Sequence, residues 1–361
     1  MCSLALQGYA QNDNQYKEKS KYISVSQYWK EHNILQHMDI SLIAGTTGIG
    51  LEVSSPIGNY LKVRAGYEFT PRITVNMKFN AMIGDESAAT SDKFARMSTL
   101  LHEISGYQVE DHINMIGKPT LNNVKLLVDV YPFRKNKHWH FTAGIYWGAS
   151  KFAYADNDTK AMTSLLSLGM YNRIYEHAIA MEPMVDWTAA GISQEVQQKY
   201  HLNIIPTELY DKIKNNGRMG FGLGYFTNDI YGTFEKDVFD MNGRRIHKAG
   251  EEGIIHAAGD RYMLEPGSDG MVHVQAKSNA LKPYVGFGYG GRLIKGNDDW
   301  QISFDAGALF WGGMPDIYTH DGINLMKDVT GIEGQVGNYI DAFKALKVYP
   351  VLNLKISRRI F

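Results

Sequence analysis

The sequence predicts an all-β protein, an antiparallel transmembrane β-barrel of about eight strands with long, partly helical extracellular loops. Three observations predict this fold. Apolar and polar residues alternate along short segments, aromatic rings gather near strand ends, and short turns alternate with long insertions. No run of the chain approaches the roughly 18 apolar residues that a membrane-spanning helix needs.

Composition and the first residues set the limits of the interpretation. The 37 basic and 38 acidic residues nearly cancel, so no nucleic-acid partner is predicted. A single cysteine excludes an internal disulfide framework. Residues 1–10 are short, apolar and end in small residues, which predicts a residual signal peptide. Residues 11–37 form a polar segment outside the main sheet, and residues 38–361 form the barrel.

Residues 60–80 are the clearest strand signal. Both halves alternate in the same phase on either side of residues 70–72, which predicts a β-hairpin of two barrel strands. The polar face carries charge at mid-strand, with Lys62, Arg64 and Glu68. In a membrane barrel that face lines the lumen, whereas in a soluble sandwich it faces water. One strand, at residues 39–54, is predicted before the hairpin.

Five more strands complete the predicted barrel. They lie at residues 124–131, 139–148, 281–292, 300–312 and 348–361. Large loop insertions at residues 83–122, 154–280 and 313–346 separate them, with helical stretches near 93–105, 160–180 and 195–214. Such insertions are typical of a barrel with loops on one side and argue against a compact soluble domain. Residues 219–226 and 271–276 would raise the count to ten strands if they crossed the membrane, but we expect them above the rim.

Aromatic residues mark both ends of the predicted strands. Trp139 and Trp300 open strands directly after short turns, while Trp147 and Phe310 lie near the opposite ends. At the tilt of a barrel strand, this separation spans roughly the 25 Å of an apolar belt. The positions therefore predict two aromatic girdles.

These segments resemble the outer-membrane β-barrel proteins of Gram-negative bacteria, especially the small eight-stranded barrels of the outer-membrane protein A and W type. The resemblance rests on the opening GTTGIGLEVSSPIGNYLKVRAGYEFTPR, the strand KPYVGFGYGG and the C-terminal Phe361. It implies residence in the cell outer membrane, contact with outer-membrane lipid and insertion by the barrel-assembly machinery, with Phe361 as the membrane-insertion signal. The residues at alternate positions before Phe361 are polar, which departs from the family pattern.

The inward face of the predicted strands carries charges of both signs. An eight-stranded barrel has room only for side chains, so we expect these charges to pair into a plug; a narrow passage for solute is the alternative. The predicted lumen charge network consists of Glu52, Lys62, Arg64, Glu68, Lys78, Lys125, Asp129, Lys282, Arg292, Lys355 and Asp305.

Chemical motifs are sparse. His138 and His140 share a strand face at a spacing that can chelate a metal, but no cysteine or carboxylate lies beside them, so we expect interfacial or lumen histidines. Residues 316–321 offer Asp316, His320 and Asp321 without regular ligand spacing, which indicates an ordinary polar turn. We therefore predict no catalytic residue, no cofactor and no metal site.

The leading interpretation is a non-enzymatic outer-membrane barrel that serves envelope structure, limited solute passage or binding of an extracellular ligand through its long loops. Two alternatives stay open. The first is an outer-membrane lipid-modifying enzyme using His273 and Ser54 near the loop-side rim. The second is a soluble, lipocalin-like ligand carrier.

Overall fold

The computed structural model describes residues 37–133, 136–182, 191, 193–200, 207–345 and 347–360. Eight antiparallel strands form a closed barrel, in which each strand pairs with the next and β1 pairs with β21. The barrel strands are β1 (Asp39–Gly45), β2 (Gly48–Ile57), β3 (Leu61–Phe69), β7 (Asn122–Val130), β8 (Trp139–Gly148), β17 (Leu281–Ile294), β18 (Asn297–Leu309) and β21 (Tyr349–Arg359). The predicted all-β class and closed antiparallel barrel of eight strands are confirmed.

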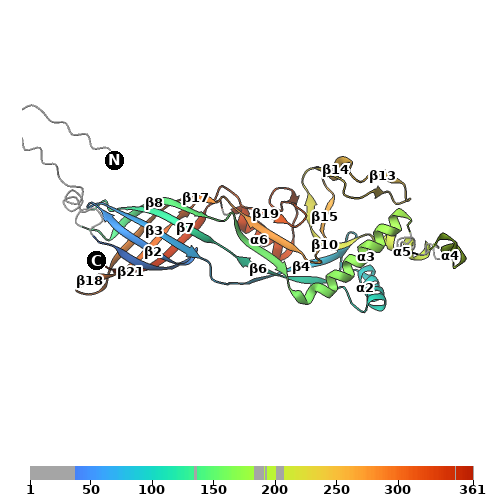
Figure 1. Ribbon diagram of the computed structural model, residues 1–361, viewed down its shortest axis with the longest axis horizontal. Coiled ribbons are helices and arrows are strands. Elements are labelled where there is room, and N and C mark those ends of the chain that lie inside the picture. Colours follow the sequence, from blue (N-terminus) through green and yellow to red (C-terminus); the bar gives the residue numbers. More distant parts are fainter. Residues whose placement is uncertain are drawn as a thin grey trace, which may run out of the picture.

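The three long connections of the barrel leave its same end and fold together into a second body, which we call the head (Figure 1). Its main sheet runs in the order β15-β10-β4-β6-β9-β16-β19, with β5 beside β4 and β20 beside β10. These strands are β4 (Val75–Ile83), β5 (Glu86–Ser87), β6 (His112–Pro119), β9 (Lys151–Asn157), β10 (Met219–Phe226), β15 (Arg261–Leu264), β16 (His273–Lys277), β19 (Asp316–Thr319) and β20 (Val329–Thr330). Every long connection contributes strands to this sheet.

Helices and two small hairpins complete the head. The helices are α2 (Asp92–Ser105), η1 (Thr159–Ala161), α3 (Met162–Ala180), α4 (Gln194–Lys199), α5 (Thr207–Asn216) and α6 (Gly334–Ala345). Strand β11 (Ile230–Thr233) pairs with β14 (Glu252–His256), and β12 (Val238–Phe239) pairs with β13 (Arg245–His247). The helical stretches predicted near residues 93–105 and 160–180 are present as α2 and α3. In the described part of the chain, none of these helices has the length and apolar character of a membrane span.

The predicted hairpin at residues 60–80 is wrong, although both of its strands exist. β3 lies in the barrel between β2 and β7, whereas β4 lies in the head between β6 and β10. The chain does not reverse at residues 70–72, because it passes from the barrel rim into the head. The predicted single strand at residues 39–54 is also wrong, since it is itself a hairpin of β1 and β2. These two errors compensate, so the strand count of eight is correct.

The predicted ten-stranded alternative does not hold. Residues 219–226 form β10 and residues 271–276 overlap β16, and both strands pair within the head sheet. The excursions that build the head run from β3 to β7, from β8 to β17 and from β18 to β21, and the first begins directly after β3 rather than at residue 83. Residues 1–10, most of residues 11–37 and the predicted insertion signal Phe361 lie outside the described residues.

The two bodies bury opposite faces of their strands. In β7, the polar Asn123, Lys125 and Asp129 are buried while Val124 and Leu126 are exposed. The head has the usual arrangement, in which apolar side chains from the sheet and helices form one core. The barrel therefore carries its polar residues inside and its apolar residues outside.

Candidate functional site: a charged barrel lumen

Arg64 lies at the centre of the lumen and contacts carboxylates from three other strands. Its guanidinium nitrogens lie 2.9 Å from Glu52 on β2, 3.0 Å from Asp129 on β7 and 3.1 Å from Asp305 on β18. Arg64 itself is only 1% exposed. The planar guanidinium presents several donors in fixed directions, which suits a cation shared by several acids.

A second cation extends the network toward the head. The ammonium of Lys125 lies 2.9 Å from Glu52 and 2.5 Å from Glu68, and the hydroxyl of Thr47 donates to Glu68 at 2.5 Å. Lys355 lies 3.5 Å from Glu52. Each buried carboxylate here has a basic partner, as a low-dielectric interior requires.

Asp305 and Asp129 receive additional hydrogen-bond partners from β8. A ring nitrogen of His140 lies 2.8 Å from Asp305, and the hydroxyl of Thr142 donates to Asp129 at 2.8 Å. At the end of the barrel away from the head, Lys62 pairs with Asp39 at 2.7 Å. The network therefore crosses the lumen and continues toward this far end.

An apolar cluster shares the lumen with these charges. It consists of Leu127, Tyr146, Tyr284, Leu309 and Val351, all buried. The rings of Tyr146 and Tyr284 lie 5.5 Å apart, and the Lys125 ammonium lies 5.8 Å from the Tyr146 ring. Gly144 makes room for this cluster, because an added Cβ would lie 2.7 Å from Leu127 Cδ2. Paired charges and packed rings thus share the barrel interior.

Most of the predicted lumen residues meet inside the barrel. Those buried or half-buried there are Glu52, Lys62, Arg64, Glu68, Lys125, Asp129, Lys282, Asp305 and Lys355. Lys282 lies on the inner face of β17, and its ammonium donates to the carbonyl of Ala280 at 3.4 Å. Asp39, Thr47, His140 and Thr142 also belong to the network but were not predicted as members. His140 was predictable, because it has the same inward phase on β8 as Thr142.

Two predicted lumen residues lie elsewhere. Lys78 is exposed on β4, which belongs to the head rather than to the barrel. Arg292 is exposed near the end of β17 and pairs with Asp298 across the connection to β18. Both have the correct phase for an inward position, but phase alone does not place a residue within the closed part of a barrel.

The other candidate groups do not converge on a site. His138 is exposed and contacts the carbonyl of Gly290, whereas His140 is buried against Asp305. Asp316 pairs with Lys327, while Asp321 accepts from the hydroxyl of Tyr262. Among the residues that the structure describes, no group of three or more histidine, cysteine or acidic side chains is arranged to hold a metal ion.

Ser54 and His273 lie in different bodies of the molecule. Ser54 pairs with Asp39 near the barrel end away from the head, because residues 39–54 turn back at residues 46–47. His273 lies on β16 in the head, where its two ring nitrogens are 2.8 Å from Asp156 and 2.7 Å from Asp269. Hydrogen bonds to Asp156 and Asp269 raise the pKa of His273. The expected placement of both residues at one rim is wrong.

No protein-family model matches the chain, and no curated protein matches it. Among solved structures it is similar to CarO2 of Acinetobacter baumannii, with 11% sequence identity and a TM-score of 0.34 over 90% of this chain and 98% of that chain. It is also similar to CarO of the same organism, with 13% identity and a TM-score of 0.33 over 89% of this chain and 96% of that chain. At these scores the likeness carries no argument, so the conclusions below rest on the geometry of this chain.

Proposed function

We propose that this chain is a non-enzymatic, integral protein of the cell outer membrane, with a plugged barrel that anchors an extracellular binding head. The inverted polarity of the barrel carries the proposal. Charged side chains are buried inside, and large apolar side chains are exposed outside. If water surrounded the barrel, exposed apolar side chains and buried charges would both be unfavourable. If lipid surrounds it, apolar side chains on the outside and charges on the inside are favoured.

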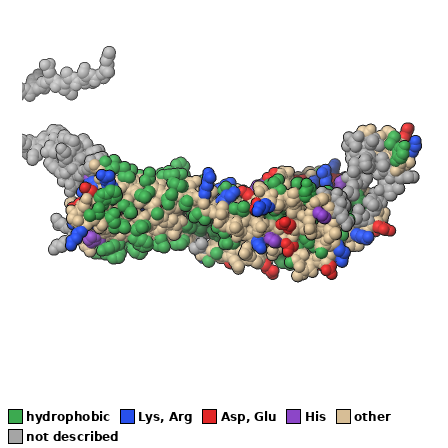
Figure 2. All heavy atoms as spheres, turned by 90° about the horizontal axis from the view of Figure 1, so that it is seen from below, with side chains coloured by type: hydrophobic (Ala, Val, Ile, Leu, Met, Phe, Trp, Pro, Cys, Tyr) green, Lys and Arg blue, Asp and Glu red, His purple; other side chains and the backbone are tan. Residues whose placement is uncertain are grey.

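Exposed large apolar side chains occur on all eight barrel strands, and we call this exterior the apolar belt. Figure 2 shows hydrophobic side chains covering the barrel, while basic and acidic side chains are scattered over the head. Exposed members of the belt on six strands are Leu42, Leu51, Tyr67, Phe69, Val124, Leu126, Trp139, Phe141, Trp147, Leu281, Phe287 and Tyr289. An apolar patch of this extent on a monomer marks contact with a membrane or a partner.

Aromatic rings near both ends of the strands fit an orientation across a bilayer. Trp139 and Tyr289 pack edge to face with ring centroids 4.9 Å apart, at the end away from the head. Trp147, at the head end of β8, is 62% exposed. Rings at both levels are typical of the interfacial girdles of membrane barrels.

The lumen geometry favours a plug over an open passage for solute. Arg64 alone bridges three strands through paired carboxylates, so a permeating solute would have to break buried ion pairs. The same charged interior argues against a lipocalin-like carrier, which needs an apolar interior for its ligand. Specific recognition then falls to the head, built on the rigid barrel rim.

Insertion would bring the protein into contact with outer-membrane lipid and with the barrel-assembly machinery, and an extracellular ligand would meet the head. A matched pair of arginine variants tests this arrangement. Leu126 in the middle of β7 is 51% exposed, and Leu166 on α3 in the head is 57% exposed. We expect Leu126→Arg to destabilise the inserted barrel by about 2–4 kcal/mol, because arginine would face the bilayer interior, and Leu166→Arg to have little effect.

The readout is electrophoretic mobility of the detergent-extracted membrane fraction, boiled against unboiled. Closed barrels resist SDS until heated, since every strand edge is paired. The wild type and Leu166→Arg should show a heat-dependent shift, and Leu126→Arg should lose the folded band. A fully soluble protein whose two variants behave alike would contradict membrane insertion and revive the soluble carrier.

A further inference from the structure

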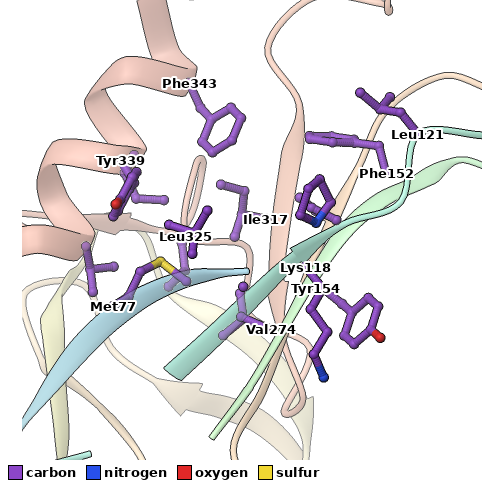
Figure 3. Close-up of a pocket in the computed structure, with 18 of the residues that line it drawn as sticks. Met77, Lys118, Leu121, Phe152, Tyr154, Val274, Ile317, Leu325, Tyr339 and Phe343 are labelled. Atoms are coloured by element: carbon purple, nitrogen blue, oxygen red, sulfur yellow. The ribbon is translucent and has the colours of Figure 1, made fainter. Parts of the chain in front are cut away.

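An apolar cavity of about 290 Å³ lies in the head, between α6 and one face of the sheet. Figure 3 shows Tyr339 and Phe343 of α6 across from Met77, Ile317 and Leu325. The cavity therefore lies where α6 covers the sheet.

Aromatic rings form the floor of the cavity at the barrel rim. The ring centroids of Phe152 and Trp311 lie 5.3 Å apart, as do those of Trp311 and Tyr349. Tyr349 packs both against the head core and against the apolar cluster of the lumen. The floor thus separates the cavity from the barrel interior.

The cavity wall offers no partner to a charged ligand. Among the described residues that line the cavity, Lys118 alone is charged, and Figure 3 shows it pointing away from Ile317 and Leu325, beside Tyr154. Its ammonium lies 5.3 Å from the Tyr154 ring centroid and 3.8 Å from Asp156. The hydroxyl of Tyr349 donates to the carbonyl of Thr46 at the rim. Burying a charge here would be unfavourable, whereas a hydrocarbon group would fit a dry apolar space.

The cavity is most open beside the start of β4 and beside α6. Val75 at the start of β4 and Tyr339 on α6 are each 39% exposed, and the other described lining residues are less exposed. Two more exposed apolar residues, Phe69 and Ile73, precede Val75 along the chain. Phe69 ends β3 and belongs to the apolar belt, and Ile73 lies between Phe69 and Val75 along the chain, where Arg72 and Thr74 are also exposed.

We propose that this cavity binds a single alkyl chain that reaches it from the membrane past Phe69, Ile73 and Val75. The proposal rests on the membrane insertion proposed above. Helix α6 would cover the bound chain, and the N–H of Lys78 on β4 donates to the side chain of Gln335 at 3.1 Å, which ties the start of α6 to the sheet. The volume is near the lower limit of about 300 Å³ for small-molecule sites, which suits one chain rather than a whole lipid.

Photolabelling of the full chain in phosphatidylcholine nanodiscs tests the proposal. One probe is a free fatty alcohol with a diazirine in its chain, and the other is a phosphatidylcholine with the same diazirine in an acyl chain. We expect labels on peptides of α6 or β16 in addition to peptides of the lipid-facing belt, such as β7. If only the fatty alcohol labels the cavity, the bound alkyl chain comes from a free amphiphile. If both probes label the cavity, it also accepts an acyl chain of membrane lipid.

Belt labelling without cavity labelling would overturn this inference and leave the proposed function standing. Absence of belt labelling would overturn both, because the barrel would then not lie in lipid. Mobility shifts on unboiled gels confirm in every case that the barrel is folded.

Filling the cavity provides the specific control. Ala276→Phe on β16 places a ring in the cavity, and Gln275→Phe adds the same ring to the neighbouring residue, which does not line the cavity. Because each displaced methylene group weakens apolar binding by roughly fourfold, Ala276→Phe should lower cavity labelling by about tenfold. Gln275→Phe should leave it unchanged. If Ala276→Phe fails to fold, the smaller change Ala155→Leu, also in the cavity wall, replaces it. Unchanged cavity labelling in a folded variant of either kind would overturn the proposal.

Discussion

Strands of the barrel and of the head share an alternating sequence pattern but bury opposite faces of it. Residues 60–80 contain one strand of each kind. In β3 the even-numbered Arg64 and Glu68 are buried while Tyr67 and Phe69 are exposed. In β4 the odd-numbered Phe79 is buried and the even-numbered Lys78 is exposed. Alternation of period two therefore identifies strands in both bodies, but the surrounding solvent decides which face is buried.

The largest difference should appear when a central arginine is removed from each body. Arg64→Met leaves Glu52, Asp129 and Asp305 without their shared cation, so we expect a loss of about 3–5 kcal/mol in the free energy of unfolding. Arg218 in the head also pairs with two acids, Glu176 and Glu265, but its side chain is 37% exposed. Arg218→Met should cost about 1 kcal/mol or less, because water screens and replaces these pairs.

Urea unfolding of both variants in the same detergent measures this difference. The folded-band assay follows the barrel, and protease sensitivity follows the head. Equal and small losses would show that water solvates the Arg64 network, and the plugged lumen would then be wrong.

A phenylalanine from each arm of residues 60–80 gives a second matched comparison. Phe79 is 2% exposed in the head core, and Phe69 is 42% exposed on the barrel exterior. Phe79→Ala should destabilise the head by about 3 kcal/mol, at the lower end for buried phenylalanine because this side chain already borders a cavity. Phe69→Ala should cost less than half as much, since lipid refills the space and no cavity forms.

Protease sensitivity during heating would report the head, and the unboiled band would report the barrel. A larger loss for Phe69→Ala than for Phe79→Ala would place β3 in a protein core, and the assignment of two environments to one segment would fail.

The sequence could predict the barrel because charged and aliphatic residues contrast most strongly on strands such as β7 and β8. The sequence could not show where the chain leaves the barrel. The apolar residues of β3 and β4 keep the same alternating phase, and residues 70–72 contain no glycine. The sequence does carry a signal for the β1–β2 turn. Gly48 follows Thr46 and Thr47, and its φ of +123° is accessible to glycine but strained for other residues.

The lumen network was predictable to the extent that phase and strand assignment were correct. Arg64, Glu52 and Asp305 lie on well-defined strands, so their inward phase placed them together. Lys78 was misplaced because β4 was assigned to the barrel. His140 was interpreted together with His138 as an interfacial or lumen histidine, not as a member of the charge network. The head was less predictable, because its sheet joins strands from three separate connections and strand order is not encoded by local alternation.

The smallest expected effect is a dependence of stability on pH that involves the head and not the barrel. His273 in the head lies between Asp156 and Asp269, and the hydrogen bonds raise its pKa above the ordinary value of 6.5. Protonated His273 therefore stabilises the folded head below about pH 6.5, and this stabilisation is lost as the pH rises through the raised pKa. Lys118 contacts Asp156 and His320 lies beside His273, so both belong to the same environment.

We expect the head of the wild type to resist proteolysis better near pH 6 than near pH 8, and His273→Gln to reduce this difference. The wild type must be compared with His273→Gln, because His256 also lies in the head and burial lowers its pKa. Titration of His256 therefore changes the stability of the head with pH in the opposite direction. The folded barrel band should not distinguish wild type from His273→Gln at either pH, because His273 lies outside the barrel. An unchanged pH response of the head in His273→Gln would remove His273 from the account and leave the pairing of β16 with β9 independent of its charge.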